Sequence, residues 1–187
     1  TEWGMPEILI AGGGIGGLAT ALALQRMGLA AELWEQAPAW GEVGAGIQLG
    51  PNVTRILQAW GLTDELNDLA AHPQVLIARD ATQGQVLGQL HLSDMPQRYG
   101  APYLTVHRAD LHGLLLRALD TQQVSLHLNR ATHQISIDSH QVQVQDQNSQ
   151  QASASVLVGA DGLWSQVRSQ VWQDTPPRPR ATGLTAA

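Results

Sequence analysis

Three glycines near the start of the chain have the spacing that a nucleotide diphosphate requires. Gly12, Gly14 and Gly17 form a G-x-G-x-x-G pattern. In such a pattern the first glycine permits a tight turn, the second lets a diphosphate approach the backbone, and the third lets a helix pack closely on a strand. Backbone N–H groups at the start of the following helix, that of Ile15 among them, would then face the diphosphate.

An acidic residue follows this turn at the distance expected for a ribose contact. Glu35 closes the second apolar run of the chain, about 20 residues beyond the glycines. A carboxylate there accepts hydrogen bonds from ribose hydroxyl groups, whereas a basic residue would favour the 2′-phosphate of NADP. We therefore predict a dinucleotide with a free adenosine ribose, FAD or NAD. A purely structural glycine turn is the alternative.

The elements that must position these residues form one predicted βαβ unit. Residues 7–11 and 29–34 are short apolar runs, and residues 18–28 between them are mostly alanine and leucine before a terminal glycine. A strand, a glycine turn, a helix and a strand in about 30 residues predict a parallel sheet with a right-handed crossover. The predicted fold class is therefore α/β, with a Rossmann-like FAD- or NAD-binding fold.

The rest of the chain predicts more helices and several antiparallel strands, separated by an irregular segment over residues 37–51. Helices are expected over residues 52–60, 64–71 (with Thr63 as the N-cap), 108–119 and 163–171. Strands are expected over residues 75–80, 85–92, 103–106, 124–128, 131–138, 141–145 and 153–158. Alternation of apolar and polar residues between positions 124 and 145 indicates an antiparallel β-meander with one solvated face.

Two further segments contain residues that could contact a cofactor. Asp161 and Arg168 would provide an acceptor and a cation near the end of a predicted strand. A turn with an aspartate cap and a surface arginine is the alternative for this pair. Arg108 begins a predicted helix, where it could reach a phosphate or a ribityl hydroxyl group, or lie in solvent.

Composition argues against several other classes of protein. The net charge of −6 opposes binding to nucleic acid, which needs a basic face. With no cysteine, the sequence excludes disulfides and cysteine-ligated metals, and its seven histidines lack metal-ligand spacing. Since no apolar run reaches about 18 residues, no transmembrane helix is expected. We predict a cytoplasmic protein that binds neither nucleic acid nor membranes.

Four stretches together resemble the FAD-dependent aromatic hydroxylases, single-component flavoprotein monooxygenases similar to salicylate and 3-hydroxybenzoate hydroxylases. These stretches are residues 8–36, 41–62, 106–119 and 156–168, in the family's order and with about its spacing. The segment GAGIQLGPN is most similar to the salicylate and 3-hydroxybenzoate branch. The resemblance spans nearly the whole chain, but only the first half of a typical family member.

The resemblance implies FAD as the bound cofactor and assigns residues to its two ends. At the adenosine end, the three spaced glycines and Ile15 would line the diphosphate, and Glu35 would hold the adenine ribose. At the flavin end, the segment Gly46, Ile47 and Gln48 would run beside the ring. The resemblance names no catalytic residue.

Two more cofactor contacts follow from the same resemblance. Arg108 would contact the middle of FAD. Asp161 lies in a motif that the family uses for the FAD diphosphate and for productive use of NADH or NADPH.

The implied reaction is hydroxylation of a small aromatic substrate of the phenolic-acid type, with NADH or NADPH as a transient electron donor and O2 as the oxidant. A homodimer is a further expectation. Two alternatives stay open: a same-scaffold flavoenzyme of another reaction, such as a quinone-pathway hydroxylase, a halogenase or a reductase, and a non-catalytic truncated dinucleotide-binding module. A plain NAD dehydrogenase is disfavoured, because it leaves the segment 159–168 unexplained.

The resemblance also predicts how the chain divides into domains. Residues 1–73 and 99–175 would be two parts of the FAD-binding domain, and residues 74–98 would be strands of an incomplete substrate domain. Residues 176–187 would begin a further, truncated substrate-domain segment. Because the family's later Gly-Asp-Ala motif is absent, we expect the chain to be the N-terminal portion of a larger enzyme.

Overall fold

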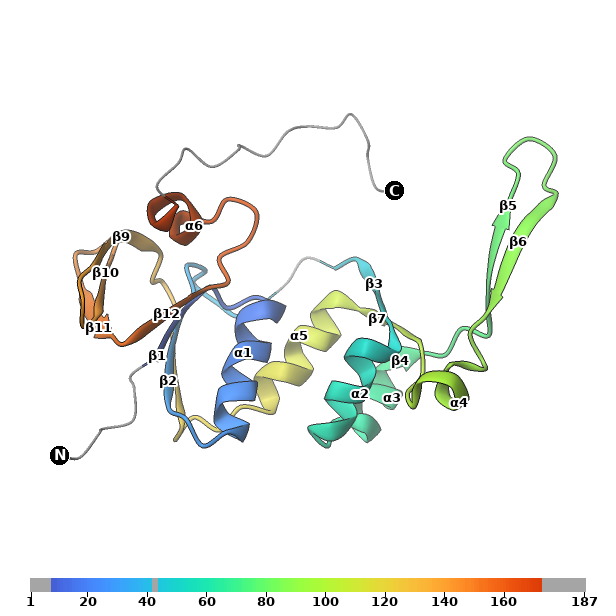
Figure 1. Ribbon diagram of the computed structural model, residues 1–187, viewed down its shortest axis with the longest axis horizontal. Helices are drawn as coiled ribbons and strands as arrows, with labels where there is room; N and C mark the ends of the chain where they lie inside the picture. The colour runs from blue at the N-terminus through green and yellow to red at the C-terminus, as the bar shows by residue number, and fades with distance from the viewer. Residues whose placement is uncertain (1–7, 42–43, 173–187) are drawn as a thin grey trace. The chain divides into compact units, whose positions relative to one another are not determined.

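The computed structural model describes residues 8–41 and 44–172, and the chain divides into two compact units. The first unit combines residues 1–40 with residues 118–187, and the second spans residues 41–117. Figure 1 labels the helices and strands of both units.

A four-stranded parallel sheet forms the centre of the first unit, in the order β12–β1–β2–β8. Its strands are β1 (Ile8–Ala11), β2 (Ala31–Trp34), β8 (Val124–His127) and β12 (Val156–Gly159). All four residues of β1 are buried. Such a continuous apolar run is typical of a parallel strand covered on both faces. The sheet confirms the predicted α/β fold class with its parallel sheet.

Helix α1 (Ile15–Arg26) connects β1 to β2 and lies along one face of this sheet (Figure 1). It buries Leu18, Ala21 and Leu22. The helix ends before Gly28, whose φ of +75° is the left-handed conformation that terminates many helices. The predicted βαβ unit is thus confirmed, with a helix that begins three residues earlier than the alanine-rich run suggested.

An antiparallel three-stranded sheet, in the order β11–β10–β9, forms the rest of the first unit together with a short helix. The elements are β9 (Thr132–Ile137), β10 (Val142–Asp146), β11 (Gln151–Ala154) and α6 (Gln166–Val171). Side chains of this meander pack with Leu9 and Trp34 of the parallel sheet in one hydrophobic cluster. The meander is therefore fixed to the strands that lead into the glycine turn and Glu35.

Two strand predictions in the first unit were wrong. The segment 124–128 was expected to be antiparallel, but β8 joins the parallel sheet beside β2. Alternation reports only that one face of a strand is solvated, which is also true at the edge of a parallel sheet. The predicted strand 153–158 is two strands separated at Ser155, because β11 pairs with β10 whereas β12 pairs with β1.

The second unit contains a small antiparallel sheet, in the order β3–β7–β4, and four helices. The strands are β3 (Gly46–Leu49), β4 (Ala70–Ala71) and β7 (Leu104–His107). The helices are α2 (Pro51–Ala59), α3 (Thr63–Leu69), α4 (Met95–Tyr99) and α5 (Arg108–Arg117). The predicted apolar face of α5 is buried at Leu111, Leu114 and Leu115, whereas Leu119 lies beyond the end of this helix, in the first unit, and is buried there.

Local predictions in the second unit needed three corrections. Thr63 is the first residue of α3 rather than its cap, which is Leu62. Residues 70–71 leave the helix and pair with β7, since a strand partner from elsewhere in the chain outweighs the helical preference of alanine. Strand β3 and helix α4 lie in segments for which no element was expected.

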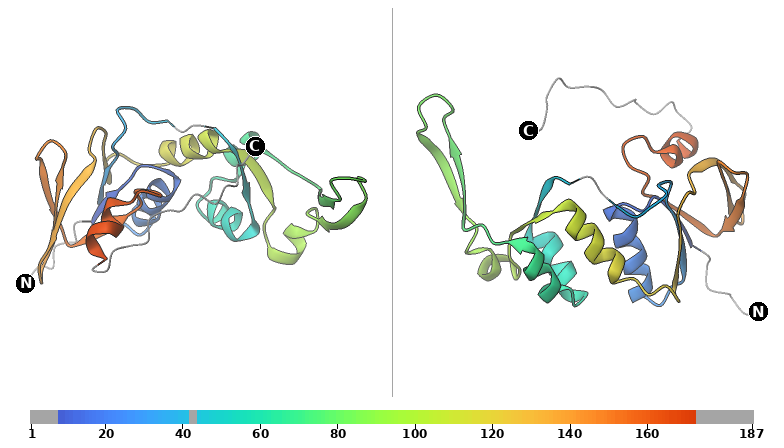
Figure 2. Two further views of the ribbon diagram at one scale, coloured as in Figure 1. Left: turned by 90° about the horizontal axis from the view of Figure 1, so that it is seen from above. Right: turned by 180° about the vertical axis from the view of Figure 1, so that it is seen from behind.

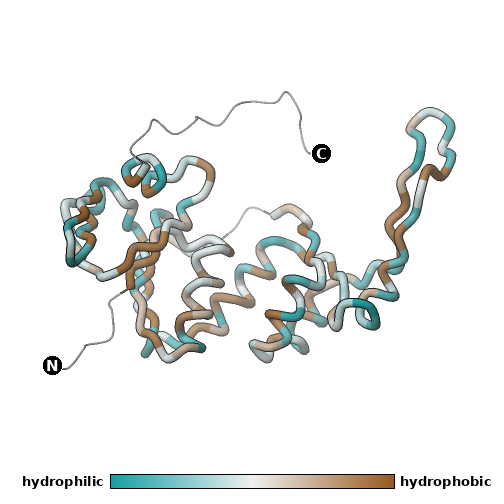
Figure 3. Tube along the Cα trace, in the orientation of Figure 1, coloured by the Kyte–Doolittle hydropathy of each residue, from teal (hydrophilic) through white to brown (hydrophobic). Residues whose placement is uncertain are grey.

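A hairpin of β5 (Val75–Arg79) and β6 (Val86–His91) completes the second unit. It extends away from α2 and α3 in both views of Figure 2, and every residue of its two strands is exposed. Figure 3 shows apolar stretches along both strands. The large apolar side chains, 37% to 68% exposed, are Val75, Leu76, Ile77, Val86, Leu87 and Leu90. The predicted hairpin is confirmed, and it presents an unusually apolar surface.

Candidate cofactor site

The glycine turn lies where β1 ends and α1 begins, at the carboxyl edge of the parallel sheet. Gly12 has a φ of +106°, which side chains rarely allow, and a Cβ added there would overlap the carbonyl oxygen of Ala160. The Gly12 N–H donates to the carbonyl oxygen of Trp34 at 2.8 Å. The turn therefore joins the ends of β1, β2 and β12.

Close packing of α1 on this turn depends on Gly17. A Cβ at Gly17 would overlap the carbonyl oxygen of Gly12, whereas one at Gly16 would meet no atom within 4 Å. Gly14 is the N-cap of α1 and contributes no capping side chain, and the first turn of α1, which begins at Ile15, holds no acidic residue. The first N–H groups of a helix have no partner within it, so this end suits an anion.

Glu35 stands directly after β2, within hydrogen-bond distance of the glycine turn. Its Oε2 accepts from the N–H of Gly13 at 2.6 Å, and its Oε1 accepts from the N–H of Ala37 at 2.7 Å. An ionised carboxylate has about four acceptor sites. Two bonds to the backbone thus orient the group and leave lone pairs for ribose hydroxyl donors.

Asp161, in the loop after β12, accepts hydrogen bonds from the first turn of helix α6, whose N-cap residue is Ser165. Its Oδ2 accepts from the N–H groups of Gln166 and Val167 at 2.7 and 3.0 Å, and its Oδ1 accepts from the hydroxyl of Ser165. Arg168 is exposed and donates to the carbonyl oxygen of Leu163 at 2.7 Å. The structure therefore resembles the alternative interpretation, with an exposed Arg168 and an Asp161 that accepts from the start of α6, although the N-cap residue is Ser165. A cofactor contact of Asp161 stays a prediction.

The flavin-side residues come together in the second unit. Gly46, Ile47 and Gln48 form most of β3, which pairs antiparallel with β7. Arg108 follows β7 directly, and its N–H donates to the carbonyl oxygen of Ala45 at 2.9 Å. This pairing places Arg108 beside the start of the predicted flavin segment.

The structure thus assembles the predicted residues in two groups. One group, in the first unit, consists of Gly12, Gly14, Ile15, Gly17, Glu35 and Asp161. The other, in the second unit, consists of Gly46, Ile47, Gln48 and Arg108. The cofactor contacts of both groups remain predictions.

Sequence reasoning missed Gly13. It donates to Glu35, and a Cβ there would lie 2.6 Å from the ring of Trp40 and 2.9 Å from Cβ of Glu35. The sequence did contain a signal, because the G-x-G-x-x-G pattern requires no glycine at position 13, between Gly12 and Gly14.

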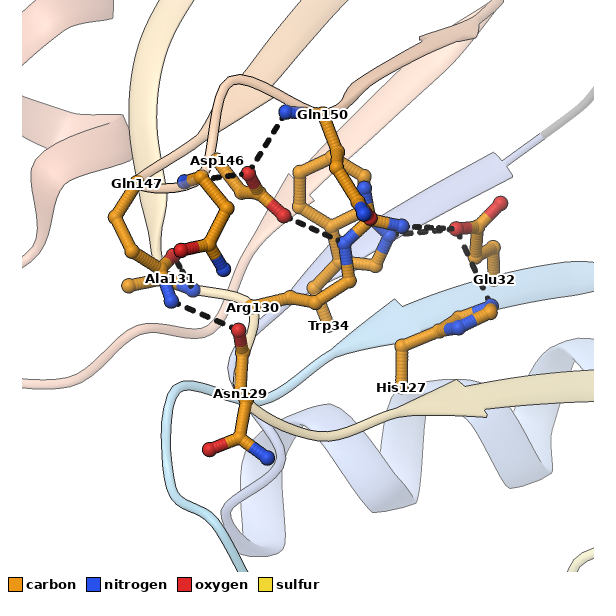
Figure 4. Close-up of polar contacts among 10 residues, drawn as sticks. Glu32, Trp34, His127, Asn129, Arg130, Ala131, Asp146, Gln147 and Gln150 are labelled. Atoms are coloured by element: carbon orange, nitrogen blue, oxygen red, sulfur yellow. Dashed lines mark hydrogen bonds and ion pairs between the residues drawn. The ribbon is translucent and has the colours of Figure 1, made fainter.

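Sequence reasoning also missed a polar network beside Glu35, shown in Figure 4. Arg130 Nε donates to Asp146 Oδ2 at 2.8 Å, and the guanidinium lies 4.0 Å from the ring centroid of Trp34. The indole N–H of Trp34 donates to Glu32 Oε1 at 2.6 Å, and His127 Nε2 lies 3.3 Å from the same oxygen. These contacts tie β2, β8 and the meander together.

The buried carboxylate of Asp146 is well satisfied within this network. Its Oδ1 accepts from the N–H groups of Asn148 and Gln150 at 2.8 and 3.0 Å. Burial raises the pKa of Asp146, but the hydrogen bonds from Arg130, Gln150 and Asn148 outweigh it, and the pKa lies below its ordinary value of 3.8. Asp146 is therefore ionised at neutral pH.

Among the described residues, no group of three or more histidine, aspartate or glutamate side chains could hold a metal ion. None of the helices in the described ranges is long and apolar enough to cross a membrane.

The geometry of the first unit defines a class of protein fold. A parallel βαβ unit, a glycine turn at the helix N-terminus and an acidic residue after the second strand form a dinucleotide-binding fold. The family model described as "FAD binding domain" matches residues 5–182 of the chain. The chain belongs to this FAD-binding domain family.

Curated relatives include two bacterial hydroxylating enzymes. The 3-hydroxybenzoate 6-hydroxylase of Polaromonas naphthalenivorans is 40% identical over 178 residues, 94% of this chain and 44% of that protein. The 6-hydroxynicotinate 3-monooxygenase of Bordetella bronchiseptica is 38% identical over 169 residues, 90% of this chain and 44% of that protein. The chain thus spans less than half the length of these relatives, and the predicted family resemblance is confirmed.

Solved structures have the same fold. Klebsiella pneumoniae HpxO complexed with FAD and uric acid matches with a TM-score of 0.76 and 26% identity, covering 87% of this chain and 41% of that one. The 2,6-dihydroxypyridine-3-hydroxylase from Arthrobacter nicotinovorans matches with a TM-score of 0.72 and 25% identity, covering 89% and 39%.

Proposed function

We propose that this chain supplies the FAD-binding part of a flavin-dependent monooxygenase that hydroxylates a small aromatic substrate. One observation carries the proposal: the carboxylate of Glu35 is bonded to Gly13 in the glycine turn. An oriented acceptor thereby stands beside a helix N-terminus that suits a diphosphate. The relatives support the reaction class, since their names specify hydroxylation of 3-hydroxybenzoate and 6-hydroxynicotinate.

The residues of the first unit fit the adenosine end of FAD. The turn leaves no room for side chains at Gly12 or Gly17, and the open helix end at Gly14 presents N–H groups. We assign the diphosphate to this end and the adenine ribose to Glu35. Asp161 would reach the diphosphate side through its loop.

The residues of the second unit would hold the flavin end of FAD. Strand β3 offers the backbone of Gly46, Ile47 and Gln48, and Arg108 provides a cation at the neighbouring strand end. When bound, FAD would accept two electrons from NADH or NADPH and react with O2. The protein's part is to orient the cofactor and to exclude water around it.

The balanced reaction consumes one aromatic substrate, one O2, one NAD(P)H and one proton. It yields the hydroxylated ring, NAD(P)+ and water, so one oxygen atom enters the product. A phenolic acid is the substrate class we favour. The homodimer and the cytoplasmic location predicted from the sequence remain predictions.

The exposed hairpin of β5 and β6 supports the proposed division into domains. Its six large apolar side chains, 37% to 68% exposed, form a surface that is typical of an interaction site. We propose that residues 74–98 belong to a substrate domain, between the two parts of the FAD-binding domain at residues 1–73 and 99–175. The proposed last segment, residues 176–187, lies outside the described residues.

A direct test uses the purified full-length protein. We expect bound flavin in its absorbance spectrum and NAD(P)H oxidation that a hydroxylated aromatic acid stimulates. With ¹⁸O2, mass spectrometry should find one labelled oxygen in the product. Flavin without labelled product would favour a reductase on the same scaffold, and a protein that takes up no FAD would contradict the proposal.

A further inference from the structure

Glu35 is held by the segment that follows β8. Its N–H donates to the carbonyl oxygen of His127 at 2.8 Å, and its carbonyl oxygen accepts from the N–H of Arg130 at 2.9 Å. A third bond, from the N–H of Asn129 to the carbonyl oxygen of Ala37 at 3.1 Å, extends the pairing. The position of residues 127–130 therefore determines the position of the Glu35 backbone.

Arg130 anchors this segment through its side chain. The bond from its Nε to Asp146 at 2.8 Å joins two groups that are 14% and 0% exposed. Removing one member of a buried ion pair leaves the other charge uncompensated, which is strongly unfavourable. The side chain of Arg130 is therefore held firmly against β10.

The same guanidinium also contacts the residue that precedes Glu35. It lies over the buried indole of Trp34, 4.0 Å from the ring centroid, as Figure 4 shows. Trp34 is fixed in turn by its bond to Glu32 at 2.6 Å. Arg130 thus contacts two consecutive residues, because its N–H donates to the carbonyl oxygen of Glu35 while its side chain packs on the ring of Trp34.

We propose that Arg130 is a positioning residue for the cofactor, acting through Glu35. The proposal rests on the proposed role of Glu35 as the ribose acceptor. With Arg130 in place, the carboxylate of Glu35 is already aimed before FAD arrives, so little ordering remains to oppose binding. Without the side chain of Arg130, residues 127–130 lose their anchor to Asp146 and Trp34, and the backbone and carboxylate of Glu35 lose that support.

A double-mutant cycle tests this claim by FAD titration of the full-length protein, followed by flavin fluorescence. We expect Arg130→Met and Glu35→Gln each to raise the Kd of FAD about tenfold. The double variant should bind no more weakly than Glu35→Gln alone, because Arg130 acts only through that carboxylate. General loosening of the fold would instead multiply the two effects.

A second pair of variants guards against misfolding. Arg130→Met combined with Asp146→Asn removes both buried charges, and the asparagine oxygen can still accept from the N–H groups of Asn148 and Gln150. When the paired variant replaces Arg130→Met in the double-mutant cycle with Glu35→Gln, the Kd values of FAD should follow the same pattern. Arg55→Met removes an exposed arginine and serves as the matched control, with an unchanged Kd expected.

The outcomes separate this inference from the proposed function. If Glu35→Gln weakens FAD binding and the Arg130 variants do not, or if the effects multiply, the positioning role is wrong while the ribose role stands. If Glu35→Gln leaves the Kd unchanged, the ribose role is wrong and the inference built on it falls as well.

Discussion

The carboxylate of Glu35 accepts a hydrogen bond from the N–H of Gly13 at 2.6 Å. This bond crosses from the end of β2 to the turn after β1, the two places where a dinucleotide would be held. It also gives the middle glycine of the run a purpose, since a side chain at Gly13 would overlap Glu35 and Trp40. The predicted ribose acceptor and the predicted diphosphate site are thus joined by a direct hydrogen bond.

Reversing the charge at Glu35 should weaken FAD binding. In Glu35→Arg we expect a loss of about 1–3 kcal/mol, because a partly buried acceptor is removed and an unmatched charge is introduced. Isothermal titration with FAD measures the loss directly. Asp68→Arg, at an exposed position of α3, is the control. Equal affinities for Glu35→Arg and the unaltered protein would refute the assignment of Glu35.

Gly17 and Gly16 offer a matched pair of substitutions one residue apart. In Gly17→Ala the added methyl group overlaps the carbonyl oxygen of Gly12, so we expect a loss of stability of about 1–3 kcal/mol. In Gly16→Ala the methyl group meets no atom within 4 Å, and stability should hold or rise by up to about 1 kcal/mol. Urea unfolding without cofactor compares the two. Similar losses in both variants would argue against the close packing of α1.

Asp146 should make the stability of the first unit depend on acidic pH. Its pKa is lower in the folded protein than the ordinary 3.8, so its contribution is complete above that value and is lost as pH falls through the folded-state pKa. Asp146→Asn should cost about 3 kcal/mol at neutral pH, because Arg130 loses its buried partner and keeps only the longer ion pair with Glu32 at 3.7 Å. Urea unfolding between pH 3 and 7 measures the difference.

The direction in which the stabilising effect of Asp146 changes with pH is the most specific prediction. The difference in the free energy of unfolding between Asp146→Asn and the unaltered protein should become smaller only as the pH is lowered. Asp68→Asn, which changes an exposed carboxylate, should show little effect at any pH. A difference in the free energy of unfolding that stays constant from pH 7 down to pH 3 would mean that folding does not lower the pKa of Asp146.

The exposed hairpin of β5 and β6 allows a test of the proposed substrate domain. Leu87 is 68% exposed in this chain, so Leu87→Ala in residues 1–187 should change the free energy of unfolding by no more than about 0.5 kcal/mol. In the full-length protein the same change should cost about 2 kcal/mol or more, because a substrate domain would cover the side chain. Equal small effects in both proteins would contradict the proposed domain division.

The local parts of the site could be predicted from the sequence. Gly12, Gly17 and Glu35 lie in one βαβ unit, where spacing alone determines which residue reaches the turn. The alternative role of Asp161 at the start of the last helix was also predicted, although Ser165 is the N-cap residue there. These features depend on neighbours within a few residues or on one crossover.

The parts that were missed depend on partners far away in the sequence. Arg130 meets Trp34 and Asp146 only because β8 joins the parallel sheet and the meander folds against it. Neither the direction of β8 nor its partner can be derived from alternation of apolar residues. Likewise, Ala70 and Ala71 became a strand because β7 lies beside them.

The central claim is that the glycine turn and Glu35 hold the adenosine end of FAD. A crystal structure of the full-length protein with FAD tests it most directly. We predict the diphosphate at the N-terminus of α1, and a ribose hydroxyl group within hydrogen-bond distance of the Glu35 carboxylate. FAD bound elsewhere, or with its ribose out of reach of Glu35, would contradict the account.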